Sequence, residues 1–269
     1  MDDDQPSRAY PDPPAAQGGG FKGLGSRLAL IPPLSFVLIV SLLPAAPSAW
    51  PGDSVAWLVV LNTLFLVVAP LIASYFAARA YAASGSIIIL AIGSGLLLSG
   101  LSSHIAGHVM RGHGGTNSAV TIHNTGFLLC SLLNLAASWM SFSGGKKRKM
   151  LRGGRTLHVP VFYGASFLMV GLITLLALQD LLPAFFIPGQ GPTPFRQAVL
   201  SLAVTFFLIA SAAFMFIYFR IRVSFLCWYA LSLLLIGQGL GIILFVDQLG
   251  SLMNWAGRAY QYLGGAYFL

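Results

Sequence analysis

Histidines are the residues in this sequence best suited to chemistry. Four of the five fall between positions 104 and 123. His104 and His108 are four residues apart, which places both imidazoles on one face of a helix, as two ligands of one metal ion require. His113 and His123 would complete a tetrahedral set. His108 and His113 also fit a Gly-rich outer loop, where imidazoles are solvated, and no carboxylate stands nearby to orient them. A transition-metal site and a group of solvated histidines therefore both stay open.

A haem is a more specific form of the metal hypothesis. His104 and His123 lie at similar depth on consecutive predicted helices. Their imidazoles could serve as the two axial ligands of a haem held between those helices. A metal ion or a haem would make the chain a redox or metal-binding membrane protein.

The composition predicts the environment of these residues. Hydrophobic residues make up 57% of the chain, charged residues only 8%, and the mean hydropathy is +0.80. A soluble domain carries about 25% charged residues. Because so few charges cannot cover a globule of 269 residues, lipid must be the main solvent. We therefore predict an all-α, polytopic transmembrane helical bundle.

Apolar runs divide the chain into spans. A spanning helix needs about 20 mostly apolar residues. The sequence contains seven complete runs of that kind and an eighth near the last residue, which predicts seven or eight spans. The predicted spans are 28–47, 55–78, 86–106, 119–142, 157–181, 195–219, 223–246 and 252–269.

The two ends of the chain need separate interpretations. Residues 1–27 are rich in Pro, Gly and Asp, which predicts a disordered cytoplasmic tail before a single transmembrane domain, 28–269. The segment 28–47 fits either an extra span or a signal peptide cleaved near Ala46-Pro47-Ser48. The last run is still apolar at Leu269, which is typical of a fragment of a longer chain.

Basic residues predict the orientation, because cytoplasmic loops carry the excess of Lys and Arg. With a cytoplasmic N-terminus, twelve basic residues fall inside and three outside, which also places the C-terminus inside. The inside residues are Arg8, Lys22, Arg27, Arg79, Lys146, Lys147, Arg148, Lys149, Arg152, Arg155, Arg220 and Arg222. The outside residues are Arg111, Arg196 and Arg258.

Polar side chains within the predicted spans gather towards the outer surface. Such side chains are costly in a bilayer, so they usually face the bundle interior or a wet cavity. They predict either an outer ligand or signal pocket, or hydrogen bonds that hold the helices together. The pocket candidates are His123, Asn124, Arg196, Gln197, Gln238, Arg258 and Gln261.

The loop 188–197 predicts a well-defined corner. Its first residues, Pro-Gly, end the preceding element, Thr193 can cap the next span, and the proline after it suits a first helical turn. Arg196 should then lie at the outer interface, either paired with Asp180 or Asp247 or extended towards the headgroups. There it could bind an anion.

Several classes of function find no support in the residues. The chain has no GxSxG elbow, phosphate loop, HExxH motif or carboxylate pair, and its seven acidic residues include no Glu, so we expect no enzyme. The net charge of +8 comes from loop residues rather than a basic helix face, which argues against nucleic-acid binding. Cys130 and Cys227 lie in apolar runs and predict packed thiols, with no disulfide framework.

Four segments carry a resemblance to a known family. They are Thr121 to Gly126 (TIHNTG), Pro188 to Gln197, Trp228 to Leu231 (WYAL) and Gln261 to Gly265 (QYLGG). In this order and spacing they resemble the N-terminal membrane-associated, multi-helix sensor domain of prokaryotic sensor histidine kinases and diguanylate cyclases. The resemblance covers about residues 55–269.

The resemblance implies a function and partners. It implies an input module in the prokaryotic inner membrane, whose last helix leads to a cytoplasmic transmitter domain or kinase. It also implies that the protein is a homodimer. Any kinase or cyclase activity would lie in such a domain, outside these 269 residues. His123, Asn124, Arg196, Gln197 and Gln261 match the family pattern, whereas the other outer histidines do not. The alternatives are the metal or haem protein and a small transporter subunit.

Overall fold

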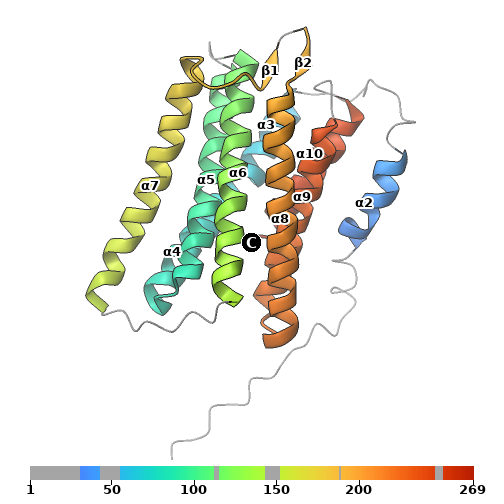
Figure 1. Cartoon of the computed structure of the whole chain (residues 1–269). Coiled ribbons are helices and arrows are strands. Elements are labelled where there is room, and N and C mark those ends of the chain that lie inside the picture. Colours follow the sequence, from blue (N-terminus) through green and yellow to red (C-terminus); the bar gives the residue numbers. More distant parts are fainter. Residues whose placement is uncertain (1–30, 43–54, 112–114, 143–151, 188, 246–250) are drawn as a thin grey trace, which may run out of the picture.

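The structure is a computed structural model that describes residues 31–42, 55–111, 115–142, 152–187, 189–245 and 251–269. These residues form an almost entirely helical bundle (Figure 1). The helices are α2 (Ile31–Leu42), α3 (Val55–Leu61), the π-helix η2 (Asn62–Val68), α4 (Ala69–Ser84), α5 (Ile87–Arg111), α6 (Gly115–Phe142), α7 (Arg152–Leu178), α8 (Pro194–Ile221), α9 (Ser224–Leu244) and α10 (Leu252–Ala266). Two short strands, β1 (Phe186–Ile187) and β2 (Gly191–Pro192), form a hairpin between α7 and α8.

Six helical segments of the described chain are long and apolar enough to cross a membrane. They are Trp57–Ser84, Ile87–Arg111, Gly115–Phe142, Leu157–Leu178, Pro194–Ile221 and Ser224–Leu244. The first is continuous through α3, η2 and α4. The prediction of an all-α bundle with membrane character is therefore confirmed, and six of the predicted spans correspond to these segments.

The other two predicted spans contain shorter helices in the part of the chain that the structure describes. Of the span 28–47 only the 12 residues of α2 are described, and α10 has 15 residues, below the roughly 20 needed to span a bilayer. Helix α10 begins near one end of the bundle, and the C-terminus lies beside its middle (Figure 1). The last helix therefore does not reach the far end within these residues, in agreement with the prediction of an eighth span that only begins near the last residue. The tail 1–27, the possible cleavage site at 46–48 and the loop 143–151 lie outside the described residues.

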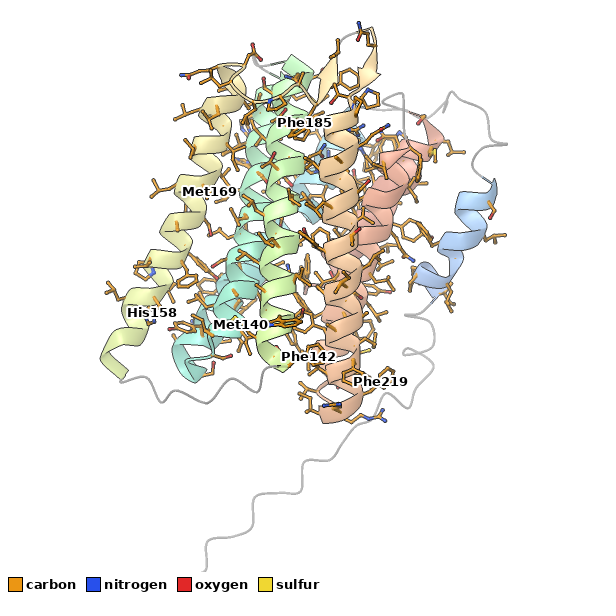
Figure 2. The ribbon with its side chains drawn as sticks, viewed as in Figure 1. Met140, Phe142, His158, Met169, Phe185 and Phe219 are labelled. Carbon is orange, nitrogen blue, oxygen red and sulfur yellow. The ribbon has the colours of Figure 1, made fainter. Side chains whose placement is uncertain are left out.

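The two ends of the bundle are easily told apart. We call the end that carries β1 and β2 the hairpin end. Figure 2 shows Phe185 there, whereas His158, Phe142 and Phe219 lie at the opposite end. Consecutive long helices therefore run in alternating directions, with α6, α8 and α10 all starting at the hairpin end.

Helices α5 and α9 form the centre of the bundle. In each, 67% of the most apolar window is buried, against 22% for α7, which lies at the side. The core fills with side chains from α5, α6, α8 and α9, among them Phe127, Phe207, Phe214 and Tyr229. Large apolar side chains on the outer faces, such as Leu168 on α7, which is 76% exposed, fit a lipid surround.

Glycines allow α10 to lie very close to its neighbours. A Cβ added at Gly239 of α9 would lie 2.5 Å from the carbonyl oxygen of Gly257 on α10, and one at Gly265 would meet the backbone oxygen of Phe65 in η2. Small residues are used in this way where membrane helices approach backbone to backbone. The position of α10 is thus closely determined from two sides.

The corner predicted at 188–197 is confirmed where it is described. Thr193 is the N-cap of α8 and accepts a hydrogen bond from the backbone N–H of Arg196 at 3.2 Å. Gly189 and Gly191 adopt φ values of +79° and +90°, which turn the chain between the strands. Asn117 of α6 adds an anchor that the sequence did not reveal, since its Oδ1 accepts hydrogen bonds from the N–H groups of Phe185 and Phe186.

Candidate functional site

Arg196 projects into the bundle from the first turn of α8. Only 6% of the residue is exposed, and its Nε is buried with no hydrogen-bond partner. Because Arg196 is buried, the prediction that it extends towards the headgroups is wrong. The predicted pair with Asp180 is also wrong, because Asp180 lies exposed in the turn after α7. Asp247 lies outside the described residues. The cap at Thr193 sets the start of α8 and so places Arg196 in its first turn.

Helix α6 contributes His123 and Asn124, about 12 Å from its first residue at 1.5 Å per residue. The Nδ1 of His123 lies 3.3 Å from the hydroxyl of Ser103 on α5, and its ring packs on Phe127 at 4.6 Å between centroids. Asn124 is 4% exposed, and its Nδ2 has no partner.

Helix α10 contributes Arg258 and Gln261, which share a face because they are three residues apart. Arg258 donates a hydrogen bond from Nη1 to Oδ1 of Asn62 at 3.1 Å, while its Nε is buried and unpartnered. Gln261 is fully buried, and neither atom of its amide has a partner. The hydroxyl of Tyr262 donates to the same Asn62 oxygen at 2.7 Å.

These side chains converge near the hairpin end. Each lies within about 14 Å of the first residue of α6, α8 or α10, and all three helices begin at the hairpin end. We define the polar cluster as His123, Asn124, Arg196, Arg258 and Gln261. It holds two cations, and Asp180 is the only acidic side chain in the described part of the chain. The cluster therefore carries positive charge that no described side chain neutralises.

Two of the predicted pocket residues lie elsewhere. Gln197 is exposed, because it follows Arg196 by one position and so points about 100° away around α8. Gln238 of α9 donates a hydrogen bond to the carbonyl of Pro33 in α2 at 3.1 Å. It thus faces α2, and its Oε1 is left unpartnered there.

The predicted metal ligands do not come together among the described residues. No group of three His, Cys, Asp or Glu side chains is close enough to hold an ion in that part of the chain. His104 and His108 do share a face, with centroids 4.5 Å apart, but both are exposed, and Nδ1 of His108 lies 3.1 Å from the carbonyl of His104. His113 lies outside the described residues. His123 lies beside Ser103 of α5. Since His104 is the next residue of that helix, its side chain points about 100° away, so His104 and His123 do not face each other as two haem ligands would.

Sequence reasoning missed Asn62 as part of the site. It is one of two polar residues, with Thr63, within the apolar run VAWLVVLNTLFLVV, and it begins the π-helix η2. A polar side chain in such a run is itself a signal of function or of helix pairing, and π-helical turns are frequent at functional sites. Asn62 ties α10 to η2 through Arg258 and Tyr262.

A second buried polar group lies deeper in the bundle and is self-sufficient. The hydroxyl of Tyr229 donates to Oδ1 of Asn134, and Nδ2 of Asn134 donates to the carbonyl of Cys130 at 2.9 Å. Both Oδ1 and Nδ2 of the Asn134 amide therefore have hydrogen-bond partners. This group therefore holds α6 and α9 together and leaves no polar atom of Asn134 for a ligand.

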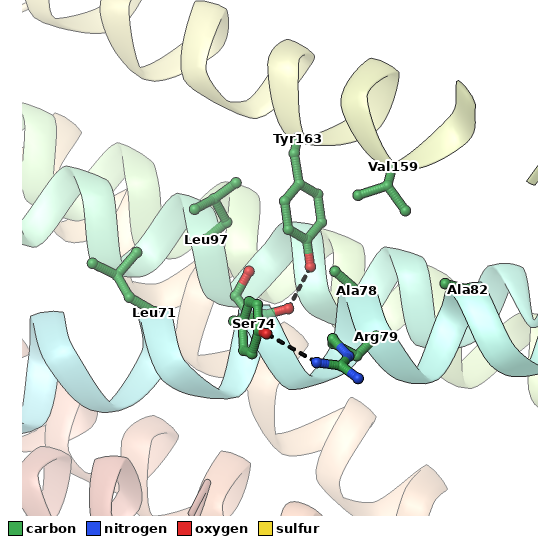
Figure 3. Close-up of a pocket in the computed structure, with 9 residues that line it drawn as sticks. Leu71, Ser74, Ala78, Arg79, Ala82, Leu97, Val159 and Tyr163 are labelled. Atoms are coloured by element: carbon green, nitrogen blue, oxygen red, sulfur yellow. Dashed lines mark hydrogen bonds between the residues drawn. The ribbon is translucent and has the colours of Figure 1, made fainter. Parts of the chain in front are cut away.

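A groove of about 570 Å³ lies between α4 and α7 towards the opposite end (Figure 3). Its lining is mostly apolar, including Leu71, Leu97 and Val159. Tyr163 closes one side by donating to the carbonyl of Ser74 at 2.6 Å. Arg79 donates to the hydroxyl of Tyr75 at 3.2 Å, so the groove has one exposed cation and none of the unpartnered amides of the polar cluster.

No protein-family model, curated protein or solved structure matches the chain. The function must therefore be argued from the site itself.

Proposed function

We propose that the chain is the membrane-embedded input module of a signalling protein, in which the polar cluster binds the stimulus and α10 passes the change on. The observation that carries this proposal is a set of buried, unpartnered polar atoms on three helices, at Asn124, Arg196, Arg258 and Gln261. Burying polar groups without partners costs free energy. A bound ligand would recover that free energy.

The charges support an orientation for this module. Arg79, Arg220 and Arg222 lie at the end opposite the hairpin, whereas the described cations of the hairpin end are Arg111 of α5 and the two arginines of the cluster. By the bias of basic residues towards the cytoplasm, the hairpin end faces outward in a prokaryotic inner membrane. A stimulus from outside or from the outer leaflet would then meet the cluster first.

Helix α10 supports a route for the signal. It carries Arg258 and Gln261 in the cluster, and it contacts η2 through Asn62 and Gly265. A ligand that prefers one of two positions of α10 shifts the population towards that position. The resemblance of the TIHNTG and QYLGG segments to sensor domains agrees with this route, with a cytoplasmic transmitter or kinase as the receiver and a homodimer as the assembly.

A chimaera tests the proposal. The full chain is extended after Leu269 by helical linkers of several lengths into a histidine-kinase transmitter, and phosphorylation is measured in isolated membranes. Arg196→Ala and His123→Ala should change phosphorylation several-fold in at least one linker register, because both alter the cluster that positions α10. Gln197→Ala is the matched control, since its side chain is exposed beside Arg196. Equal phosphorylation in all variants at equal membrane levels would contradict the proposal.

A further inference from the structure

The unpartnered atoms of the polar cluster are unequal in kind. Four are donors: Nδ2 of Asn124, Nε of Arg196, Nε of Arg258 and Nε2 of Gln261. Only one, Oε1 of Gln261, is an acceptor. Among the described residues, the cluster therefore has more unpartnered donors than acceptors, and no carboxylate neutralises its two guanidinium groups.

Hydrogen bonding between helices does not account for these donors. Elsewhere in the bundle, several buried donors point to carbonyls of neighbouring helices, although the hydroxyls of Ser74 and Ser94 have no partner. Ser211 of α8 donates to the carbonyl of Ala230 at 2.6 Å, and Ser232 of α9 donates to that of Gly264 at 2.5 Å. A cluster built only to join helices would find acceptors in the same way.

We propose that the polar cluster binds one oxyanion, a carboxylate or a phosphate group, between the guanidinium groups of Arg196 and Arg258. The inference rests on the proposed function for its site and adds the chemistry of the ligand. An oxyanion offers only acceptors and negative charge, and a guanidinium matches it with paired N–H donors. The amides of Asn124 on α6 and Gln261 on α10 supply further donors. A metal cation is disfavoured by the same charges.

The ligand can be a soluble anion or the headgroup of an anionic lipid, and one measurement distinguishes them. The thermal unfolding midpoint of the full chain is measured in neutral detergent with inorganic phosphate, with succinate, and with chloride at equal ionic strength. It is measured again in nanodiscs of phosphatidylcholine with and without phosphatidylglycerol. Binding at about 100 times the dissociation constant should raise the midpoint by about 5 to 10 °C. A rise with phosphate or succinate indicates a soluble anion, and a rise with phosphatidylglycerol alone indicates a lipid.

Two variants assign the effect to the cluster. Arg196→Gln removes one of the two charges and should abolish the rise, whereas Arg220→Gln, at the opposite end, should keep it. No rise in the wild-type protein under any of these conditions, or an equal rise in Arg196→Gln, would overturn the proposal.

An isosteric substitution tests the charge imbalance without any ligand. Gln261→Glu adds a carboxylate three residues from Arg258 and should raise the unfolding midpoint in the absence of oxyanions, because it supplies the missing counter-charge. Asn134→Asp is the matched control: it makes the same change in a fully buried amide with satisfied partners and should lower the midpoint. A fall in both variants would refute the oxyanion site.

The two proposals can fail separately. If oxyanions bind but the chimaera's phosphorylation ignores Arg196→Ala, the site exists and the signalling function is wrong. If phosphorylation depends on Arg196 but neither oxyanions nor Gln261→Glu stabilise the protein, the cluster signals and the ligand class is wrong.

Discussion

Arg258 donates a hydrogen bond to Oδ1 of Asn62 at 3.1 Å, although the two residues are 196 positions apart. Tyr262 donates to the same oxygen. One amide in the π-helical segment η2 therefore holds α10 in place at two points, next to the polar cluster. The bond thus links the candidate site to α10, which, among the described helices that contribute to the cluster, is the one too short to span a bilayer.

Asn62→Ala should lower the free energy of unfolding by about 1 to 2 kcal/mol, because two hydrogen bonds are lost at once. Tyr262→Phe removes only one of them and should cost about half as much. Unfolding in mixed micelles measures both. Equal effects of the two substitutions would show that Arg258 does not depend on Asn62.

Gly265→Ala should displace α10, because the added Cβ would collide with the backbone of Phe65, which cannot rotate away. The expected loss of stability is about 1 to 3 kcal/mol. Gly171→Ala is a matched control on α7, where a Cβ would meet nothing within 4 Å. If both variants unfold like the wild-type protein, α10 and η2 are farther apart than the structure shows.

Tyr229→Phe should lower the free energy of unfolding by about 1 to 3 kcal/mol, because it leaves the buried Oδ1 of Asn134 without its donor. Tyr75→Phe, at an exposed position on α4, should have little effect. The same unfolding assay compares them. A neutral Tyr229→Phe would mean that Asn134 finds another donor, such as water.

The two ends of the bundle should differ in access to reagents. In a variant without the buried Cys130 and Cys227, a cysteine at Gln190 of the hairpin should react with a membrane-impermeant maleimide added outside the cells. A cysteine at Val223, between α8 and α9, should react only after permeabilisation. The reverse pattern would invert the orientation derived from the basic residues.

The exposed histidines offer a test of the metal alternative. Replacing His104 and His108 together by Ala should leave the unfolding midpoint within about 1 °C, because their rings contact each other on an exposed face rather than core residues. Elemental analysis of the purified protein and its reduced-minus-oxidised spectrum complete the test. A bound metal or haem that disappears in this variant would favour the redox alternative over the sensor.

Local features of the sequence determined the helices and the corner between them. Apolar runs long enough to span a bilayer can satisfy their backbone only as helices, and six such runs are helices in the structure. The cap at Thr193 is equally local, since it needs only a hydroxyl three residues before the N–H that it accepts. The residue types of the cluster were also evident, because buried cations and amides are rare in apolar runs.

Only the tertiary structure decided which of those residues meet. In a soluble protein, the periodicity of apolar residues shows which face of a helix is inside. In lipid the outer face is apolar too, so the sequence could not show that Arg196 turns inward while Gln197 turns outward. Nor could it show that Asn62, 196 positions from Arg258, completes the anchor. The rotation of each helix about its axis depends on close backbone contacts such as that of Gly265 with Phe65, and these form only when the helices pack together.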